Sequence, residues 1–156
     1  MFNKTSILAV GAALVNLASA IGHAKITNSC AFNVTAWSVG SNTAGPYLLT
    51  ADGGTYDEVL TKDPTTGGRS LKITLEEDGL YNGKAQTNYA YTLDGDKVWY
   101  DLSNVFGDPF KGHKLVVASD NPACPSIVLD DGVPTGKNHV KTCESNSSVT
   151  LTLCAK

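Results

Sequence analysis

The sequence predicts a single all-β domain, a sandwich or barrel of short strands held together by two disulfides. Short runs rich in Val, Ile, Thr and aromatic residues recur along the chain, separated by Gly, Pro, Asn and Asp, as is typical of strands joined by turns. No stretch shows sustained helical periodicity. The chain also contains four cysteines, an even number that predicts paired sulfurs if the chain is exported.

The expected strands were located from the alternation of apolar and polar residues and from the Gly, Pro, Asn and Asp residues that interrupt strands. The clearest alternation of apolar and polar residues runs through 149–154. Asp94-Gly95-Asp96 lies between two β-rich runs and predicts a hairpin turn, because Asp-Gly readily supplies a positive φ. Residues 63–68 and 132–138 hold Pro, Gly and Thr and are expected to be loops. The predicted strands are 24–28, 32–39, 55–60, 70–75, 88–93, 98–102, 114–118, 126–129 and 149–154.

The N-terminal residues have the pattern of a secretory signal peptide. Met1–Lys4 carries a positive charge, Ser6–Leu17 is almost entirely apolar, and Ala18-Ser19-Ala20 places small residues at the cleavage spacing. The apolar run is too short for a membrane-spanning helix, which needs about 20 residues. We therefore expect residues 1–20 to be removed and residues 21–156 to form one secreted domain, extracellular or in the cell wall, without a membrane anchor.

Charge excludes two classes of partner. The formal net charge is −3 at pH 7, and lysines are not clustered along the chain. A mildly acidic chain of this kind is poorly suited to bind nucleic acid or an anionic membrane. We expect a monomer that uses no cofactor.

The cysteines Cys30, Cys124, Cys143 and Cys154 permit three pairings. None has the C-x-x-C spacing of a zinc or redox site, so no metal is expected. We favour a nested arrangement. A Cys30–Cys154 bond would close nearly the whole mature chain, which the loop-entropy model credits with about 4–5 kcal/mol. A Cys124–Cys143 bond would join the two ends of a segment rich in Pro and Gly.

Two glycosylation sequons are present. Asn33-Val34-Thr35 and Asn146-Ser147-Ser148 both have the Asn-x-Ser/Thr pattern. In an exported protein these asparagines are candidate glycan acceptors, which predicts that both lie on an exposed surface.

Three blocks of sequence, in order, resemble thaumatin-like proteins. The first is Ala24–Cys30, a strand ending in Asn-x-Cys, followed by the aromatic-rich Phe32–Trp37. The second is Val98–Phe110, with its Tyr-Asp-x-Ser…Gly…Pro pattern, and the third is Thr142–Cys154, which resembles the closing strand of the family. In that family the last cysteine pairs with the first, in agreement with the nested arrangement.

The chain is similar in particular to a small fungal branch, the Blastomyces yeast-phase-specific and CetA-like secreted proteins. The resemblance is carried by Ser38-Val39-Gly40, Gly45-Pro46, Gly67–Ile73, Val98–Ser103 and Phe106–Phe110. It implies a thaumatin-like β-sandwich in its small form, without the cysteine-rich second domain of plant thaumatins. It also implies a fungal extracellular or cell-wall location.

Some thaumatin-like proteins carry an acidic cleft, built from an Arg, a Glu and three Asp, that is associated with β-1,3-glucan binding or slow hydrolysis. By its Tyr-x-Ser context, Asp101 matches one of these aspartates and is the one candidate catalytic carboxylate. Tyr89-Ala90-Tyr91 stands where the Glu is expected, and Arg69 lies in a different context. Hydrolysis needs two carboxylates about 5–10 Å apart. The cleft is incomplete, although Asp130-Asp131 could supply a partner carboxylate.

Aromatic side chains beside Asp101 extend the candidate site, because sugars stack on rings. The candidate ligand-binding residues are Asp101, Tyr89, Tyr91 and Trp99. Each has a structural alternative. Tyr89 and Tyr91 share one face of a strand and could pack in the core. Trp99 and its neighbour Tyr100 point to opposite faces, so at least one belongs to the core. Asp101 could accept hydrogen bonds from Ser103 or the backbone.

Signal cleavage after Gly22 would make His23 the N-terminal residue. An N-terminal histidine can chelate copper together with a second histidine, and His113 and His139 are the available partners. No motif places either of them near His23, so we do not expect this site.

Taken together, the sequence predicts a secreted fungal thaumatin-like protein that is not an enzyme and acts at the cell wall or a host surface, with β-glucan as the expected ligand. One alternative is a weak β-1,3-glucanase. Another is a secreted effector or antigen that binds a host protein, which would need an exposed apolar patch.

Overall fold

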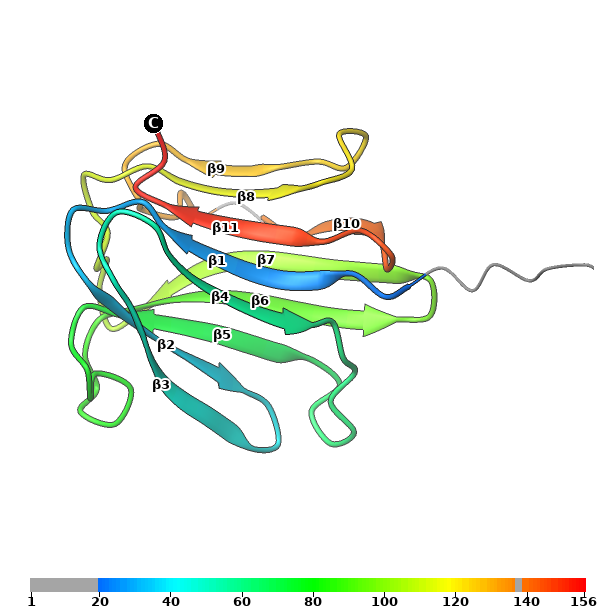
Figure 1. Ribbon diagram of the computed structural model, residues 1–156, viewed down its shortest axis with the longest axis horizontal. Helices are drawn as coiled ribbons and strands as arrows, with labels where there is room; N and C mark the ends of the chain where they lie inside the picture. The colour runs from blue at the N-terminus through cyan, green and yellow to red at the C-terminus, as the bar shows by residue number, and fades with distance from the viewer. Residues whose placement is uncertain (1–19, 137–138) are drawn as a thin grey trace, which may run out of the picture.

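The all-β prediction is confirmed. The computed structural model describes residues 20–136 and 139–156, so the predicted signal peptide lies outside the described residues except for Ala20. Within this part of the chain no helix could cross a membrane. The strands, shown in Figure 1, are β1 (His23–Asn28), β2 (Val34–Val39), β3 (Thr43–Leu49), β4 (Gly54–Val59), β5 (Arg69–Thr74), β6 (Gln86–Asp94), β7 (Lys97–Val105), β8 (Leu115–Ser119), β9 (Ile127–Leu129), β10 (Lys141–Glu144) and β11 (Val149–Leu153).

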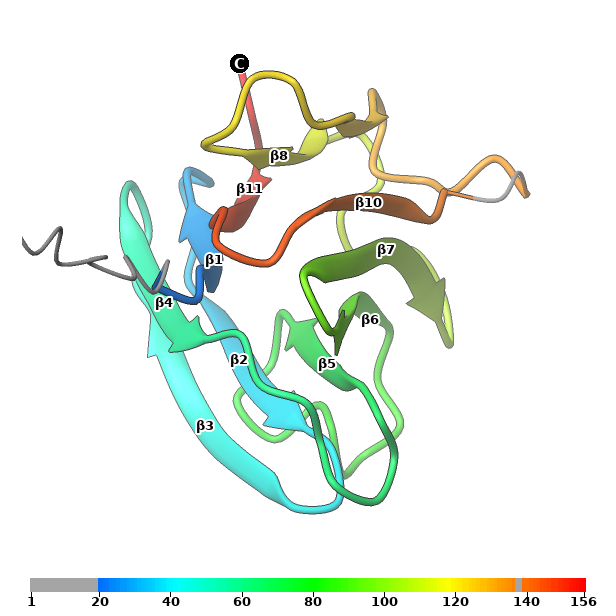
Figure 2. The same cartoon turned by 90° about the vertical axis from the view of Figure 1, so that its right-hand side faces the viewer.

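These strands form a two-layered sandwich. One sheet has the order β4-β1-β11-β8-β9 and the other the order β10-β7-β6-β5-β2-β3. Figure 2 shows β1, β11 and β8 in one layer and β7, β6, β5 and β2 in the other. The first and last strands, β1 and β11, pair in parallel, whereas the other described pairs are antiparallel. The two ends of the domain therefore meet in the middle of one sheet.

The core lies between the sheets and follows from alternation along the strands. Every second residue from Val149 to Leu153 in β11, and from Val98 to Leu102 in β7, is buried. The fully buried Tyr89 of β6 also reaches across the sandwich, where its hydroxyl donates a hydrogen bond to the Val149 carbonyl at 3.0 Å. Each large apolar side chain buried in this way contributes about 1.5–3 kcal/mol to folding.

Two edge strands, β3 and β10, were missing from the predicted set. In β3 the dipeptide Gly45-Pro46 has the composition of a turn, yet an edge strand tolerates proline because one side of its backbone needs no partner. The pairing of β2 with β3 shifts register between Ala36 and Ser38. Strand β10 is only four residues long, and its single buried residue, Cys143, gives no alternation to detect.

The nested disulfides are confirmed. Cys30 is bonded to Cys154 across a sequence separation of 124, and Cys124 to Cys143 across 19. The first bond joins the chain just after β1 to the chain just after β11, so it reinforces the parallel pair at the centre of the five-stranded sheet.

A polar network joins the sheets where the chain passes from β4 to β5. Arg69 of β5 donates to the Ser38 hydroxyl at 2.9 Å and lies 3.6 Å from the Glu58 carboxylate of β4. Its guanidinium is also 3.5 Å from Asp63, in the connecting loop. Asp63 accepts hydrogen bonds from the backbone N–H groups of Ser41, Thr65 and Thr66 and from the Ser41 hydroxyl.

The Asp63 carboxylate predicts a specific loss of stability in acid. Hydrogen bonds from the backbone N–H groups of Thr66 and Ser41 hold the pKa of Asp63 far below its usual range. Asp63 therefore stabilises the fold at pH values above its unfolded pKa of about 3.9, and this contribution is lost as the pH falls towards the folded pKa.

In thermal unfolding scans we expect Asp63→Asn to lower the melting temperature at pH 6 and to flatten its fall between pH 5 and pH 2. The matched control is Asp94→Asn, because Asp94 is exposed and its only ion pair among the described residues, with Lys62, is 3.9 Å long. An Asp63→Asn protein with the same acid profile as wild type would contradict the assignment.

Candidate functional site

The candidate site lies on the outer face of the six-stranded sheet, the face that points away from the core. The β6–β7 hairpin builds it, and the predicted turn is present, with Gly95 at a φ of 59°. Strand register places Ala90 opposite Asp101 and Thr92 opposite Trp99. Residues directly opposite each other in an antiparallel pair share a face, so these four side chains lie together.

A small hollow of about 130 Å³ opens on this face, and we call it the smaller hollow. Trp99 at its rim is 45% exposed, whereas the adjacent Tyr100 is buried in the core, as alternation predicts. Asp101 is half-buried. The smaller hollow is lined by Ala90, Tyr91, Thr92, Trp99, Tyr100, Asp101 and Val140.

Two of the four predicted ligand residues therefore meet at this hollow through their side chains. Trp99 and Asp101 are on the same strand, two positions apart, and both point outward. The Asp101 carboxylate makes no hydrogen bond or ion pair with another described residue, so the predicted structural bond to Ser103 is not formed. An exposed ring next to an unpaired acceptor can stack on a sugar and bind its hydroxyls.

The two tyrosines instead take the structural alternative. Tyr89 is fully buried, and burial raises its pKa well above the usual value. Tyr91 is 2% exposed, and its hydroxyl donates to Glu58 of the opposite sheet at 2.5 Å. Burial, followed by this hydrogen bond, raises the pKa of Tyr91. The Tyr91 side chain therefore points into the core and is not available to stack on a ligand.

A larger hollow of about 350 Å³ adjoins the first, and sequence reasoning missed it. The two share the residues 90–92 of β6, so they lie side by side across the strands, and we call the two hollows together the groove. The lining of the larger hollow is mostly small side chains and glycines, which carry no recognisable chemical pattern in a sequence. The larger hollow is lined by Val39, Gly40, Thr66, Gly68, Arg69, Ser70, Ala90, Tyr91 and Thr92.

Only one carboxylate, that of Asp101, belongs to the described residues that line this groove. Asp130 is 3.6 Å from the Lys114 ammonium, and Asp131 accepts a hydrogen bond from the backbone N–H of Val133. Neither lines the groove, so neither serves as the partner carboxylate that sequence reasoning considered. Arg69 lines the larger hollow, but its guanidinium is engaged with Glu58 and Asp63.

His23 and His113 do not lie together. The Nδ1 atom of His23 is hydrogen-bonded to Asp57 of β4. His113 packs edge-on against Phe32, with ring centroids 5.4 Å apart. Phe32 follows the far end of β1, whereas His23 begins that strand, so these two histidines lie at opposite ends of it.

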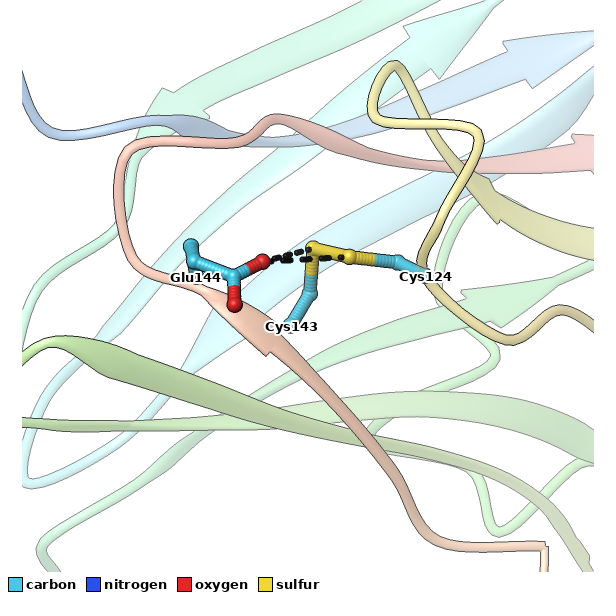
Figure 3. A group of neighbouring side chains, drawn as sticks. All are labelled: Cys124, Cys143 and Glu144. Carbon is cyan, nitrogen blue, oxygen red and sulfur yellow. Dashed lines mark hydrogen bonds between the residues drawn. A yellow bond between two sulfur atoms is a disulfide. The ribbon is translucent and has the colours of Figure 1, made fainter.

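Cys124, Cys143 and Glu144 bring three potential metal-ligand atoms within 4.8 Å of one another (Figure 3). The two sulfurs are joined in a disulfide and cannot act as thiolate ligands. Glu144 is 2.9 Å from the Lys97 ammonium, and this hydrogen bond lowers the pKa of the carboxyl group. The cluster is therefore a structural cross-link supported by an ion pair.

Exposed groups occur elsewhere on the surface. Both sequon asparagines, Asn33 and Asn146, are exposed, as the glycosylation prediction requires.

Tyr81 and Phe106 are the most exposed aromatic residues described, at 71% and 70%. They follow β5 and β7, which run in the same direction, so both lie at the end of the sheet opposite the β6–β7 turn.

Sequence comparisons identify fungal relatives along the chain. Residues 11–155 match the family model described as Blastomyces yeast-phase-specific protein. The chain is 28% identical to an antigenic thaumatin-like protein of Arthroderma benhamiae over 169 residues, covering 99% of this chain and 85% of the relative. It is 30% identical to the secreted thaumatin-like protein calA of Emericella nidulans over 144 residues, covering 85% of this chain and 81% of the relative.

Structural comparison gives the same fold. The protein elicitor MoHrip2 from Magnaporthe oryzae aligns with a TM-score of 0.71 and 22% identity, over 86% of this chain and 99% of the other. The thaumatin-like xylanase inhibitor TLXI aligns with a TM-score of 0.57 and 13% identity, over 85% and 99%. With the fold and the sequence relatives in agreement, the chain belongs to the Blastomyces yeast-phase-specific family of thaumatin-like proteins.

Proposed function

We propose that this protein is a secreted β-glucan-binding protein that acts at the fungal cell wall and has no hydrolytic activity. The observation that carries the proposal is the pairing of an exposed Trp99 ring with the unpaired Asp101 carboxylate in one hollow. A ring and a free acceptor complement the two surfaces of a sugar, its apolar C–H face and its hydroxyl edge.

Binding fits the groove better than hydrolysis. A glycoside hydrolase places two carboxylates on either side of the scissile bond, as acid and as nucleophile or base. Asp101 lacks such a partner among the described lining residues. A weak β-1,3-glucanase would need a carboxylate in this position, and Asp130 and Asp131 do not provide it.

The extracellular assignment has independent support. Two disulfides are typical of chains that fold in an oxidising compartment. One relative is named a secreted thaumatin-like protein, and the N-terminal residues have the pattern of a signal peptide. Because β-glucan is a polymer of the fungal wall, a secreted protein that binds it would be retained there.

A pull-down on insoluble β-1,3-glucan tests the proposal. We expect the wild-type protein to sediment with the polymer, and Asp101→Asn to bind about tenfold more weakly because a charged hydrogen bond is lost. Asp130→Asn is the matched control, since Asp130 is an exposed carboxylate outside the groove. A wild-type protein that stays in the supernatant, or an Asp101→Asn protein that sediments like wild type, would overturn the proposal.

A further inference from the structure

A row of polar side chains crosses the outer face beside the groove. Strand register places Trp37 opposite Lys72, Lys72 opposite Asn88, and Asn88 opposite Ser103. All four side chains therefore share the outer face. The neighbouring row consists of Val39, Ser70, Ala90 and Asp101, which line the two hollows.

Several groups in and beside the first row lack partners among the described residues. The half-buried Lys72 makes no ion pair or hydrogen bond with any of them. The buried atoms Trp37 Nε1, Asn88 Oδ1 and Gln86 Oε1 also have none, although these residues are at most 9% exposed. Buried polar atoms in native proteins nearly always have a partner. The three buried atoms belong to residues that line neither hollow, so among these groups only the half-buried Lys72 is open to a ligand.

Lys72 lies beside the larger hollow, outside its lining. It lies two residues from Ser70 on the same face of β5, a spacing of about 7 Å along a strand. A lysine side chain spans that distance, so its ammonium can donate to a group that rests on Ser70.

We propose, on the basis of the proposed function, that the larger hollow is a second sugar subsite in which Lys72 is the hydrogen-bond donor. The groove then holds a short β-glucan chain that crosses the strands from Trp99 on β7 to Val39 on β2. That path covers three strand spacings, about 14 Å, and is longer than a single sugar ring.

The distribution of charge favours a neutral chain over an ionic polymer. One unpaired cation, Lys72, and one unpaired anion, Asp101, lie in different rows on different strands. A polyanion would be repelled at Asp101 and a polycation at Lys72. Hydroxyl groups both donate and accept hydrogen bonds, so a neutral sugar chain can satisfy the Lys72 ammonium and the Asp101 carboxylate together.

Isothermal titration calorimetry with laminaribiose and laminarihexaose tests the second subsite. We expect wild type to bind the hexaose at least about tenfold more tightly than the disaccharide, because only the longer chain reaches Lys72. Lys72→Met should weaken hexaose binding about tenfold and leave disaccharide binding unchanged. Lys111→Met is the matched control, since Lys111 is an exposed lysine in the segment between β7 and β8 and does not belong to the outer face of β5 and β6.

A second variant keeps the test independent of Lys72. Ser70→Gln fills the larger hollow without a change of charge and should also abolish the advantage of the hexaose. Equal wild-type affinities for the two sugars, or hexaose affinities of Lys72→Met and Ser70→Gln equal to wild type, would overturn the second subsite alone. Failure of wild type to bind either sugar would overturn the proposed function as well.

Discussion

Replacing Cys30 and Cys154 together by serine is expected to lower the free energy of unfolding by about 5 kcal/mol. The bond spans 124 residues of sequence, so its loss greatly enlarges the conformational freedom of the unfolded chain. It also releases the ends of β1 and β11, the parallel pair at the centre of the five-stranded sheet. Equilibrium unfolding in urea, followed by tryptophan fluorescence, measures the change.

The second disulfide provides the internal comparison. Cys124 and Cys143 close a loop of only 19 residues between the edge strand β10 and the segment after β8. Their double serine variant should lose about 3 kcal/mol. A Cys30/Cys154 variant no less stable than the Cys124/Cys143 variant would contradict the role given to the long-range bond.

Trp99→Ala is expected to weaken binding of laminarihexaose about 30-fold, equivalent to about 2 kcal/mol. The ring is the exposed aromatic surface of the smaller hollow, and alanine leaves nothing for a sugar face to stack on. Because Trp99 is on the solvent side of β7, the fold should be retained, which thermal unfolding can verify. Calorimetric titration measures the affinity.

Phe106→Ala is the matched control for the tryptophan. Phe106 is more exposed than Trp99, but it lies at the opposite end of the sheet, outside both hollows. Its loss should leave the affinity within about twofold of wild type, as expected for a residue that does not touch the ligand. If the Trp99→Ala protein binds laminarihexaose as tightly as the Phe106→Ala protein, the Trp99 ring does not take part in binding.

Much of the fold could be predicted because buried strands carry a strong pattern. Alternation in 149–154 located β11, and the Asp-Gly dipeptide located the turn between β6 and β7. The edge strands β3 and β10 could not be found in this way. Edge strands bury few side chains, and in β3 the Gly45-Pro46 dipeptide has the composition of a turn.

The candidate site could be predicted only in part. Motif context singled out Asp101, and alternation showed that only one of Trp99 and Tyr100 could be exposed. Alternation put Tyr89 and Tyr91 on one face but did not settle their burial, because residues of both faces are buried in the first half of β6. The larger hollow and Lys72 emerge only when β5, β6 and β2 are aligned, since residues distant in sequence meet there.

Chemical-shift mapping with laminarihexaose tests the central claim most directly. In ¹H–¹⁵N spectra of the labelled protein, we expect the sugar to shift the amides of residues 90–92 and 99–101 and the indole N–H of Trp99. Weaker shifts should extend to Ser70 and Lys72, whereas the amides of β1 and β11 should not move. Spectra unchanged by the sugar, or shifts confined to the five-stranded sheet, would contradict a glucan-binding groove on the outer face of the six-stranded sheet.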